Sequence, residues 1–300
     1  MDTCIEPGAR LRRLYTGSVW AEGPIWLPGP ESAGRVRWSD IPNNRILEHD
    51  LTSGRTRVYS KEAEYTNGRT HDLTGAVVQC SHGRRAVERD SPDESPAPVT
   101  LVDSWQGHRL NSPNDVVVAS DGAIWFTDPP YGILTNKEGR QAPQEYGGCY
   151  VFRYDEATGE LTAPITDMIH PNGLAFSPDE SILYVSDTGD GARHLRAYDV
   201  QRPDGGSPAC VNGRVLATVR PGASDGFRID TEGRIWTSAG DGVQILTPGG
   251  EHVETIAVPE TVSNVCFGGP DGQDLFITAT SSLYTIRVTA RQAPRPAPAR

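Results

Sequence analysis

The chain contains 300 residues, of which 36% are hydrophobic, 32 are glycine and 24 are proline. This composition can build the core of one large domain or two ordinary ones, but no apolar run approaches the ~18 residues of a membrane-spanning helix. The formal net charge is −11, from 28 basic and 39 acidic residues. Because no global basic field attracts phosphate groups, we expect neither nucleic acid nor a membrane as a partner.

The cysteines and the first residues indicate the compartment. The cysteines are widely spaced and contain no CxxC pair, so we expect neither a disulfide framework nor a structural zinc site. The beginning of the chain, MDTCIEPGARLRRLYTG, lacks the apolar stretch of a signal peptide. We therefore expect a cytoplasmic protein with reduced thiols. The cysteines are Cys4, Cys80, Cys149, Cys210 and Cys266.

Short apolar runs bounded by Gly, Asp, Asn and Pro indicate many β-strands. They belong to a larger unit, in which a polar residue opens an apolar strand that is followed by a tight turn and a second apolar strand. The unit recurs at intervals of roughly 40–60 residues, which is typical of a β-propeller. We therefore predict an all-β fold, a six-bladed β-propeller with a central channel. In chain order, the copies are 22–40, 67–83, 114–128, 172–187, 225–239 and 264–279.

The predicted propeller forms a single domain over residues 1–289. Unequal spacing of the repeats places insertions at about 84–104 and 129–148, with a shorter one at 202–208. Residues 290–300 contain only Ala, Arg, Pro and Gln. This composition predicts a disordered tail outside the fold. Nothing in the sequence indicates the oligomeric state.

Six polar residues open the repeats, and the inner strands of a propeller bring their starts together at one mouth of the channel. Two carboxylates and several amides meeting there would form an all-oxygen site for one divalent cation. Such a site suits Ca²⁺ first, then Mg²⁺ or Mn²⁺, with Zn²⁺ or Fe²⁺ where waters complete the shell. Taken singly, each opener is better explained as a turn residue, but their equivalent positions favour a shared site. The openers are Glu22, Asn67, Asn114, Asn172, Asp225 and Asn264.

Long blocks of the chain resemble the senescence marker protein/gluconolactonase/luciferin-regenerating enzyme family, which includes regucalcin. The blocks are AEGPIW, LNSPNDVVVASDGAIWFTDPPYG, HPNGLAFSPD and SDGFRIDTEGRIWTSAGDGVQIL. The resemblance extends over about residues 14–288. Another block, NGRTHDLTGAVVQCSHGRRAVER, is most similar to bacterial gluconolactonases.

This resemblance implies a six-bladed propeller with one divalent cation held by Glu22, Asn172 and Asp225. Asn114 would be a fourth ligand or a substrate contact, and Asp225 would also be the catalytic base. Regucalcin-like members carry an arginine at the position of Ser112. This chain would therefore bind the sugar part of a substrate in a different way.

The implied reaction is hydrolysis of a sugar lactone, such as a gluconolactone, or of a similar cyclic ester. The cation would polarise the carbonyl group while Asp225 takes a proton from the attacking water. Side chains that can exchange hydrogen bonds with sugar hydroxyls are further candidates for substrate binding. Each of three candidates also has a structural explanation. Tyr131 could pack in a Pro-Pro turn, Glu145 could be an exposed loop residue, and His71 could satisfy a strand end. The substrate-binding candidates are Asn114, Arg69, His71, Tyr131 and Glu145.

Two other functions stay open. A phosphotriesterase-like hydrolase could use the same site, because a cation can bind a P=O oxygen as well as a C=O oxygen. A non-enzymatic propeller that binds ligands or proteins would need neither Glu22 nor Asp225. The sequence contains no GxSxG, HxH or HExxH motif, which disfavours a serine hydrolase and a histidine-rich metal site.

Overall fold

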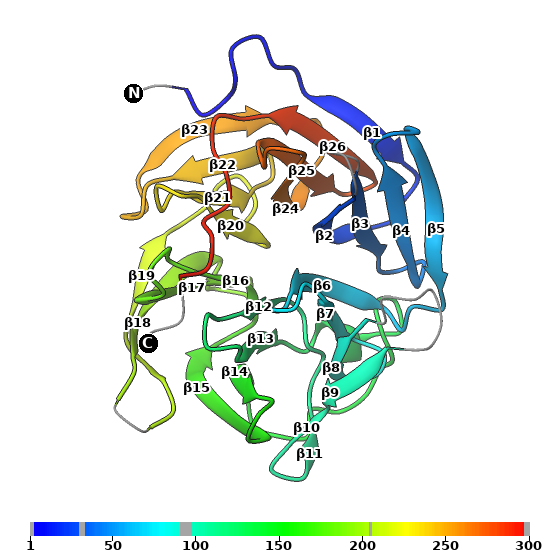
Figure 1. The fold of residues 1–300 in the computed structure, drawn as a ribbon. Helices are drawn as coiled ribbons and strands as arrows, with labels where there is room; N and C mark the ends of the chain where they lie inside the picture. Colours follow the sequence, from blue (N-terminus) through cyan, green and yellow to red (C-terminus); the bar gives the residue numbers. More distant parts are fainter. Residues whose placement is uncertain (1–2, 30–33, 91–97, 204–205, 297–300) are drawn as a thin grey trace.

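The computed structural model of the chain describes residues 3–29, 34–90, 98–203 and 206–296. In this part, six four-stranded antiparallel sheets stand in a ring around a central axis (Figure 1). The prediction of an all-β, six-bladed propeller is therefore confirmed. The single helix among the described residues is α1 (Tyr131–Leu134), which lies within the predicted insertion at 129–148.

Each of the first five blades contains four strands that follow one another from the axis outward. Blade 1 contains β2 (Ala21–Pro28), β3 (Gly34–Asp40), β4 (Arg45–Asp50) and β5 (Arg55–Lys61). Blade 2 contains β6 (Thr66–His71), β7 (Val77–Ser81), β8 (Ala86–Arg89) and β9 (Val99–Val102). Blade 3 contains β12 (Val116–Val118), β13 (Ile124–Asp128), β14 (Cys149–Asp155) and β15 (Glu160–Met168). Blade 4 contains β16 (Pro171–Phe176), β17 (Ile182–Asp187), β18 (His194–Gln201) and β19 (Ala209–Ala217). Blade 5 contains β20 (Phe227–Ile229), β21 (Ile235–Ser238), β22 (Gly242–Leu246) and β23 (His252–Ala257).

Blade 6 closes the ring with strands from both ends of the chain. Its first three strands are β24 (Val262–Gly268), β25 (Asp274–Ala279) and β26 (Ser282–Arg287), and its outer strand is β1 (Arg12–Thr16). Because β1 pairs with β26, opening the ring requires breaking a strand pair. A separate hairpin of β10 (Ser104–Trp105) and β11 (His108–Arg109) lies between blades 2 and 3.

The core lies between neighbouring blades, where large side chains of one blade pack on the next. Trp38 of β3 packs with Phe276 of β25, and Trp125 of β13 packs with Leu183 of β17. Both tryptophans are at most 1% exposed. A single blade would leave these apolar faces in water, so burial between blades holds the ring together.

Other predictions are met in different degrees. All five cysteines are free, as expected. Among the described residues, no helix is long and apolar enough to cross a membrane. Residues 91–97, within the predicted insertion 84–104, and residues 204–205, within 202–208, lie outside the described part.

The C-terminal segment differs from the expectation of a disordered tail over 290–300. Residues 290–296 lie along the ring, and Ala293 N donates to Ile229 O of blade 5 at 2.9 Å. Arg295 donates to the carbonyl oxygens of His71 and Asp72 in blade 2. The composition did not predict these contacts because they are hydrogen bonds of the backbone and of an arginine side chain. A segment of low hydropathy can form such bonds without burying apolar side chains. Residues 297–300 lie outside the described part.

Candidate active site

Five of the six predicted openers line one pocket of about 360 Å³ at a mouth of the channel. Glu22, Asn114 and Asn172 are 4%, 5% and 8% exposed, so their side chains are nearly enclosed. The sixth opener, Asn264, lies behind the pocket and donates from Nδ2 to Glu22 Oε2 at 3.1 Å. The lining residues are Trp20, Glu22, Ile41, Asn67, Asn114, Tyr131, Lys137, Glu138, Asn172, Thr188 and Asp225.

Hydrogen bonds between blades fix the backbone of the openers. In three cases a hydroxyl on the second strand of one blade donates to the carbonyl oxygen of the next opener. Ser39 donates to Asn67 O at 3.1 Å, Thr127 donates to Asn172 O at 2.7 Å, and Ser186 donates to Asp225 O at 2.7 Å. The backbone carbonyl groups of these three openers are therefore buried and hydrogen-bonded to the neighbouring blade, and their side chains can face the pocket.

A glycine follows four of the openers, and close approach between blades explains it. A Cβ atom on Gly173 would overlap the carbonyl oxygen of Asp225, and one on Gly23 would overlap that of Asn67. Gly226 similarly approaches the Asn264 side chain. These glycines therefore mark where neighbouring inner strands touch. If the Asn-Gly and Asp-Gly pairs were only turn residues, this close contact between strands would have no explanation.

We expect Gly173→Ala to lower the free energy of unfolding by about 3 kcal/mol, because the added methyl group has to displace backbone. Gly147→Ala is the matched control, since a Cβ atom there meets nothing within 4 Å. Urea unfolding of both variants checks this. Equal stability of the two variants would show that the blades can separate at Gly173 without cost.

The two carboxylates among the openers stand in an unfavourable environment for negative charge. Burial, with a contribution from the nearby Asp115 carboxylate, raises the pKa of Glu22 to about 7, although Gly23 N donates a hydrogen bond to it at 2.5 Å. Burial also raises the pKa of Asp225 well above its usual value, and Glu22 and Asp115 add to the shift. Asp115 is 2% exposed, and its Oδ2 atom has no hydrogen-bond partner. Sequence reasoning did not single out this third carboxylate.

This donor set fits a divalent cation. Carboxylate and amide oxygens are the ligands that hard cations prefer. A positive ion between Glu22 and Asp225 would offset both the burial of these carboxylates and the repulsion from neighbouring carboxylates, which together raise their pKa values. The described residues contain no cluster of three or more His, Cys, Asp or Glu side chains suited to a metal. A cation in this pocket would therefore depend on amide oxygens such as those of Asn114 and Asn172.

A buried histidine supports one side of the pocket. Burial lowers the pKa of His82 to about 4, so the ring is neutral at physiological pH. Its Nδ1 lies 2.9 Å from Glu138 O and its Nε2 lies 3.3 Å from Asn67 Nδ2. A neutral ring that donates from Nδ1 and accepts at Nε2 satisfies both contacts. His82 thereby links the 129–148 segment to an opener, a role that the search for metal-binding histidine motifs could not detect.

The 129–148 segment supplies the wall that faces a substrate. Tyr131 lies in the pocket, with its hydroxyl 2.5 Å from Thr188 Oγ1, and Asn172 Nδ2 donates to the same Oγ1 at 3.2 Å. Lys137 and Glu138 also line the pocket, although the sequence analysis chose Glu145 from this segment. The identity of a loop residue that faces inward depends on the path of the loop, which no periodicity reveals.

Three predicted substrate contacts are not brought to this pocket. Arg69 and His71 lie two and four residues beyond the opener Asn67, so strand β6 carries them roughly 7 and 13 Å along the channel. They line a different cavity. Glu145 pairs with Arg85 at 3.1 Å and accepts from Arg109 N at 2.9 Å, and it does not line the pocket of the openers. These three residues therefore do not line the pocket of the openers, and their role in substrate binding stays a prediction.

Fold and pocket together define a six-bladed propeller with an oxygen-rich pocket at one mouth of its channel. The sequence matches the SMP-30/gluconolactonase/LRE-like region over residues 20–281. The chain belongs to this family, as the resemblance predicted.

Similar proteins carry lactonase names. The chain is 28% identical to a gluconolactonase of Zymomonas mobilis, over 96% of this chain and 83% of that protein. It is 27% identical to a pentonolactonase of Haloferax volcanii, over 89% and 84%. The solved structure of a gluconolactonase from Xanthomonas campestris superposes with a TM-score of 0.87 at 37% identity, covering 95% of this chain and 91% of that one. The prediction of a lactonase-type enzyme agrees with these names.

Proposed function

We propose that the chain is a hydrolase that opens a sugar lactone or a similar cyclic ester in the pocket of Glu22, Asn114, Asn172 and Asp225. The observation that carries the proposal is the convergence of these four side chains from four blades. The lactonase names of relatives that match most of the chain support the same reaction class.

In the proposed mechanism, Asp225 acts as the base. An Oδ atom of Asp225 takes a proton from a water molecule, and the water oxygen attacks the carbonyl carbon of the lactone. The ring C–O bond then breaks, the ring oxygen takes up a proton, and the product is a hydroxy acid. Asp225 has to be ionised to accept this proton, and burial raises its pKa well above the usual value. The positive charge of a bound cation would favour the ionised form near neutral pH.

A divalent cation held by Glu22, Asn114, Asn172 and Asp225 would supply Lewis-acid stabilisation of the negative charge that develops on the carbonyl oxygen. Ca²⁺ is our first choice because all the donors are oxygens, with Mg²⁺, Mn²⁺, Zn²⁺ and Fe²⁺ as alternatives. The residues of this chain hold the pocket open around the reacting carbon, and Asn264 fixes the Glu22 carboxylate by its bond to Oε2.

The rest of the pocket favours a polyhydroxylated substrate. Tyr131, Thr188, Lys137 and Glu138 offer hydroxyl, ammonium and carboxyl groups, which can donate to or accept from sugar hydroxyls. An organophosphate presents no hydroxyl groups to these partners, so lactone hydrolysis is the better fit to the pocket.

Acid release from glucono-δ-lactone and xylono-γ-lactone, measured against turnover of a phosphotriester, tests the substrate class. We expect kcat/KM for at least one lactone to exceed that for the phosphotriester by about a hundredfold, because only the lactone uses the hydroxyl partners. Spontaneous opening of the lactones is subtracted from a protein-free control. Faster turnover of the phosphotriester would assign the pocket to that reaction, and no turnover of any substrate would favour a binding propeller.

A further inference from the structure

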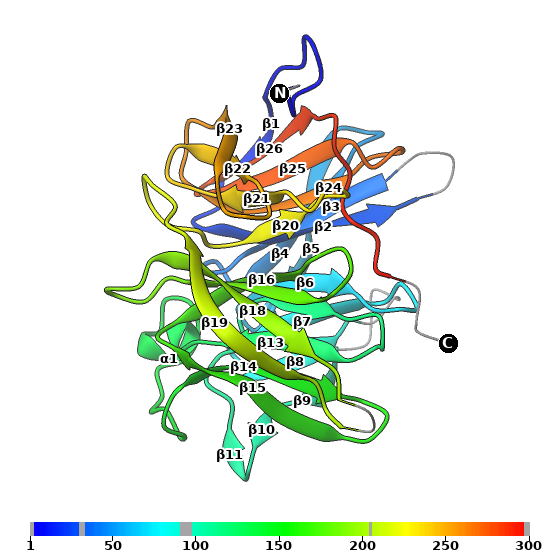
Figure 2. The ribbon, with the colours of Figure 1, turned by 90° about the vertical axis from the view of Figure 1, so that its left-hand side faces the viewer.

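A second cavity, of about 660 Å³, lies further along the channel than the openers. Its lining comes from later residues of the same inner strands, including Trp26 of β2, His71 of β6 and Arg228 of β20. The C-terminal segment, which also lines it through Gln292, and helix α1 lie on opposite faces of the ring (Figure 2). We call this cavity the far-mouth pocket.

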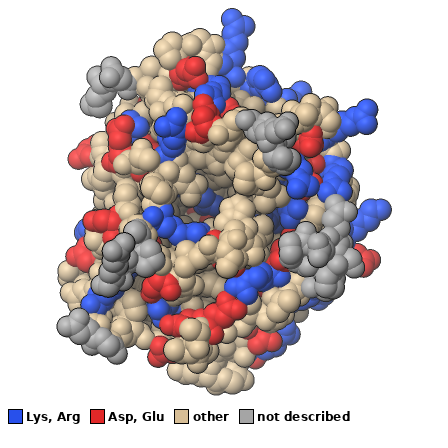
Figure 3. Space-filling model, viewed as in Figure 1, with Lys and Arg blue, Asp and Glu red and all other residues tan. Residues whose placement is uncertain are grey.

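The far-mouth pocket is strongly basic. Among the described residues, four arginines and one carboxylate, that of Asp90, line it. On the face shown in Figure 3, basic side chains are visible in the hollow near the centre of the ring. The four arginines are Arg35, Arg37, Arg69 and Arg228.

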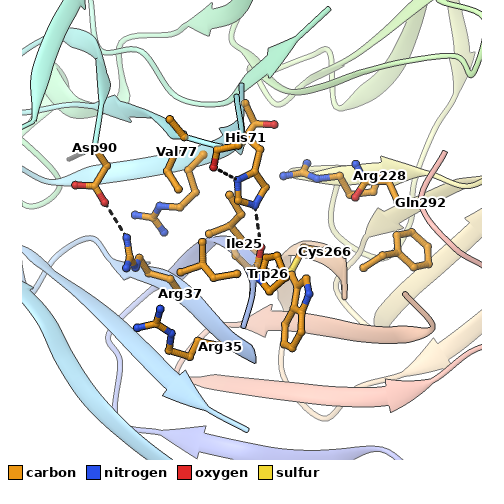
Figure 4. A pocket seen from close by; sticks show the side chains of 18 of the residues that line it. Ile25, Trp26, Arg35, Arg37, His71, Val77, Asp90, Arg228, Cys266 and Gln292 are labelled. Atoms are coloured by element: carbon orange, nitrogen blue, oxygen red, sulfur yellow. Dashed lines mark hydrogen bonds and ion pairs between the residues drawn. The ribbon is translucent and has the colours of Figure 1, made fainter. Parts of the chain in front are cut away.

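Two of these arginines form ion pairs. Arg37 pairs with Asp90 at 2.7 Å and with Glu48 at 2.8 Å, and the pair with Asp90 is visible in Figure 4. Arg35 also pairs with Glu48, at 3.2 Å. Glu48 also pairs with Arg57 at 3.0 Å, so three arginines share the carboxylates of Glu48 and Asp90. The side chains of Arg35 and Arg37 therefore form a fixed wall, and the other two arginines add to its positive charge.

Arg69 makes no ion pair with the described residues, although Asp90 and Glu22 lie close enough to attract its charge. Its side chain is 1% exposed, and its Nη atoms donate at 2.7 Å to neutral acceptors, Gly23 O and Ser39 Oγ. Its Nε atom has no hydrogen-bond partner. Burial, followed by the nearby Arg37, lowers the pKa of Arg69 to about 10, which shows that its positive charge is unfavourable there. Buried arginines are almost always paired.

Arg228 is only weakly paired. Its Nη1 donates to the neutral Phe227 O at 2.8 Å, and the carboxylate oxygen Asp115 Oδ2 lies 3.7 Å away. That distance is too long for a hydrogen bond. In Figure 4, the guanidinium group of Arg228 and the ring of His71 face the same space.

An apolar surface completes the pocket. Ile25, Trp26, Val77 and Phe267 line it, and Trp26 is held in place by stacking on Phe276 with ring centroids 5.6 Å apart. Both ring nitrogens of His71 are engaged by backbone carbonyls, Nε2 with Trp26 O at 2.8 Å and Nδ1 with Gly75 O at 3.1 Å. The walls are therefore preformed, as in small-molecule sites, and the volume is within the roughly 300–1,000 Å³ of such sites.

We propose that the far-mouth pocket is a second binding site, which takes a small organic acid. The carboxylate of the ligand compensates the charges of Arg69 and Arg228. The ligand also carries an apolar ring, which lies against Trp26. The C-terminal segment forms one wall through Gln292, held by Arg295 on blade 2 and by Ala293 on blade 5. The site is separate from the openers and does not depend on the reaction proposed for them.

Isothermal titration of the full chain with benzoate, and with benzyl alcohol as the neutral analogue, tests the proposal. We expect benzoate to bind with a Kd of about 1 mM or lower, and at least about tenfold more tightly than benzyl alcohol, because only benzoate carries the charge. Arg228→Gln should weaken benzoate binding by about tenfold, whereas Arg214→Gln, on the outer strand β19, should leave it unchanged. Equal binding of the two ligands would overturn the proposal, as would unchanged affinity in Arg228→Gln.

Two further variants of the chain test the proposal if Arg228→Gln does not fold. Deletion of residues 291–300 removes the wall that contains Gln292 and should weaken benzoate binding several-fold. Asp225→Asn, at the other mouth, should bind benzoate as the unchanged chain does. Loss of benzoate binding in Asp225→Asn would place the ligand among the openers and refute a second site, and full affinity after the deletion would refute the role of the C-terminal wall.

Discussion

Asp225→Asn is expected to reduce kcat for lactone hydrolysis by about a thousandfold or more, because the amide cannot accept the proton of the attacking water. The substitution keeps the size of the side chain, so the pocket of Glu22, Asn114 and Asn172 should retain its shape. Initial rates of acid release with saturating divalent cation, with the unchanged chain assayed in parallel, measure the effect.

Asp199→Asn is the matched control for this experiment. Asp199 lies on β18 of blade 4 and pairs with Arg214 at the surface, so its replacement should leave the rate unchanged. Near-normal turnover by Asp225→Asn with bound cation would transfer the role of base to another group, with Glu138 of the same pocket as the next candidate.

Removal of divalent cations is the second large expected effect. After treatment with a chelator, we expect no lactone hydrolysis above the spontaneous rate, and adding Ca²⁺ back should raise Tm by on the order of 5 °C at about 100 times Kd. The physical reason is that the cation binds the folded pocket and relieves the repulsion between Glu22 and Asp225. Thermal unfolding reads out this binding independently of activity.

Glu22→Gln should abolish most of this rise in Tm, because it removes one of the two carboxylates that hold the cation. Glu232→Gln serves as the control, since its side chain is 68% exposed on blade 5. A full rise in Tm with Glu22→Gln would show that the stabilising cation binds elsewhere. No rise in the unchanged chain with Ca²⁺, Mg²⁺, Mn²⁺, Zn²⁺ or Fe²⁺ would contradict a cation site altogether.

The repeat made the fold predictable from the sequence. Each of the six copies contains the inner strand of one blade and its neighbour, and the predicted openers lie within two residues of the starts of β2, β6, β12, β16, β20 and β24. A blade that needs its neighbours to bury its faces leaves the same polar-to-apolar pattern in every repeat. The strand β1, which closes blade 6 from the other end of the chain, left no such pattern, because a single exposed outer strand has no repeat to compare with.

The candidate site was predictable as far as the repeat reaches. Glu22, Asn67, Asn114, Asn172 and Asp225 line one pocket because equivalent positions in a ring face the same axis. Arg69 and His71 were misplaced, although they follow Asn67 closely, because an extended strand moves each residue about 3.3 Å away from the mouth. Arg69 and His71 are therefore close to Asn67 in the sequence but lie further along the channel.

The number of blades, the openers and the family were predictable without the structure, since they depend on residues that recur at equivalent positions. Only the tertiary structure showed which side chains of the 129–148 segment face the pocket, that Asn264 and Asp115 stand behind Glu22, and that four arginines meet at the far-mouth pocket. These groups come from different blades and from irregular loops. Their meeting depends on how the ring closes and on the path of each loop, which local patterns in the chain do not encode.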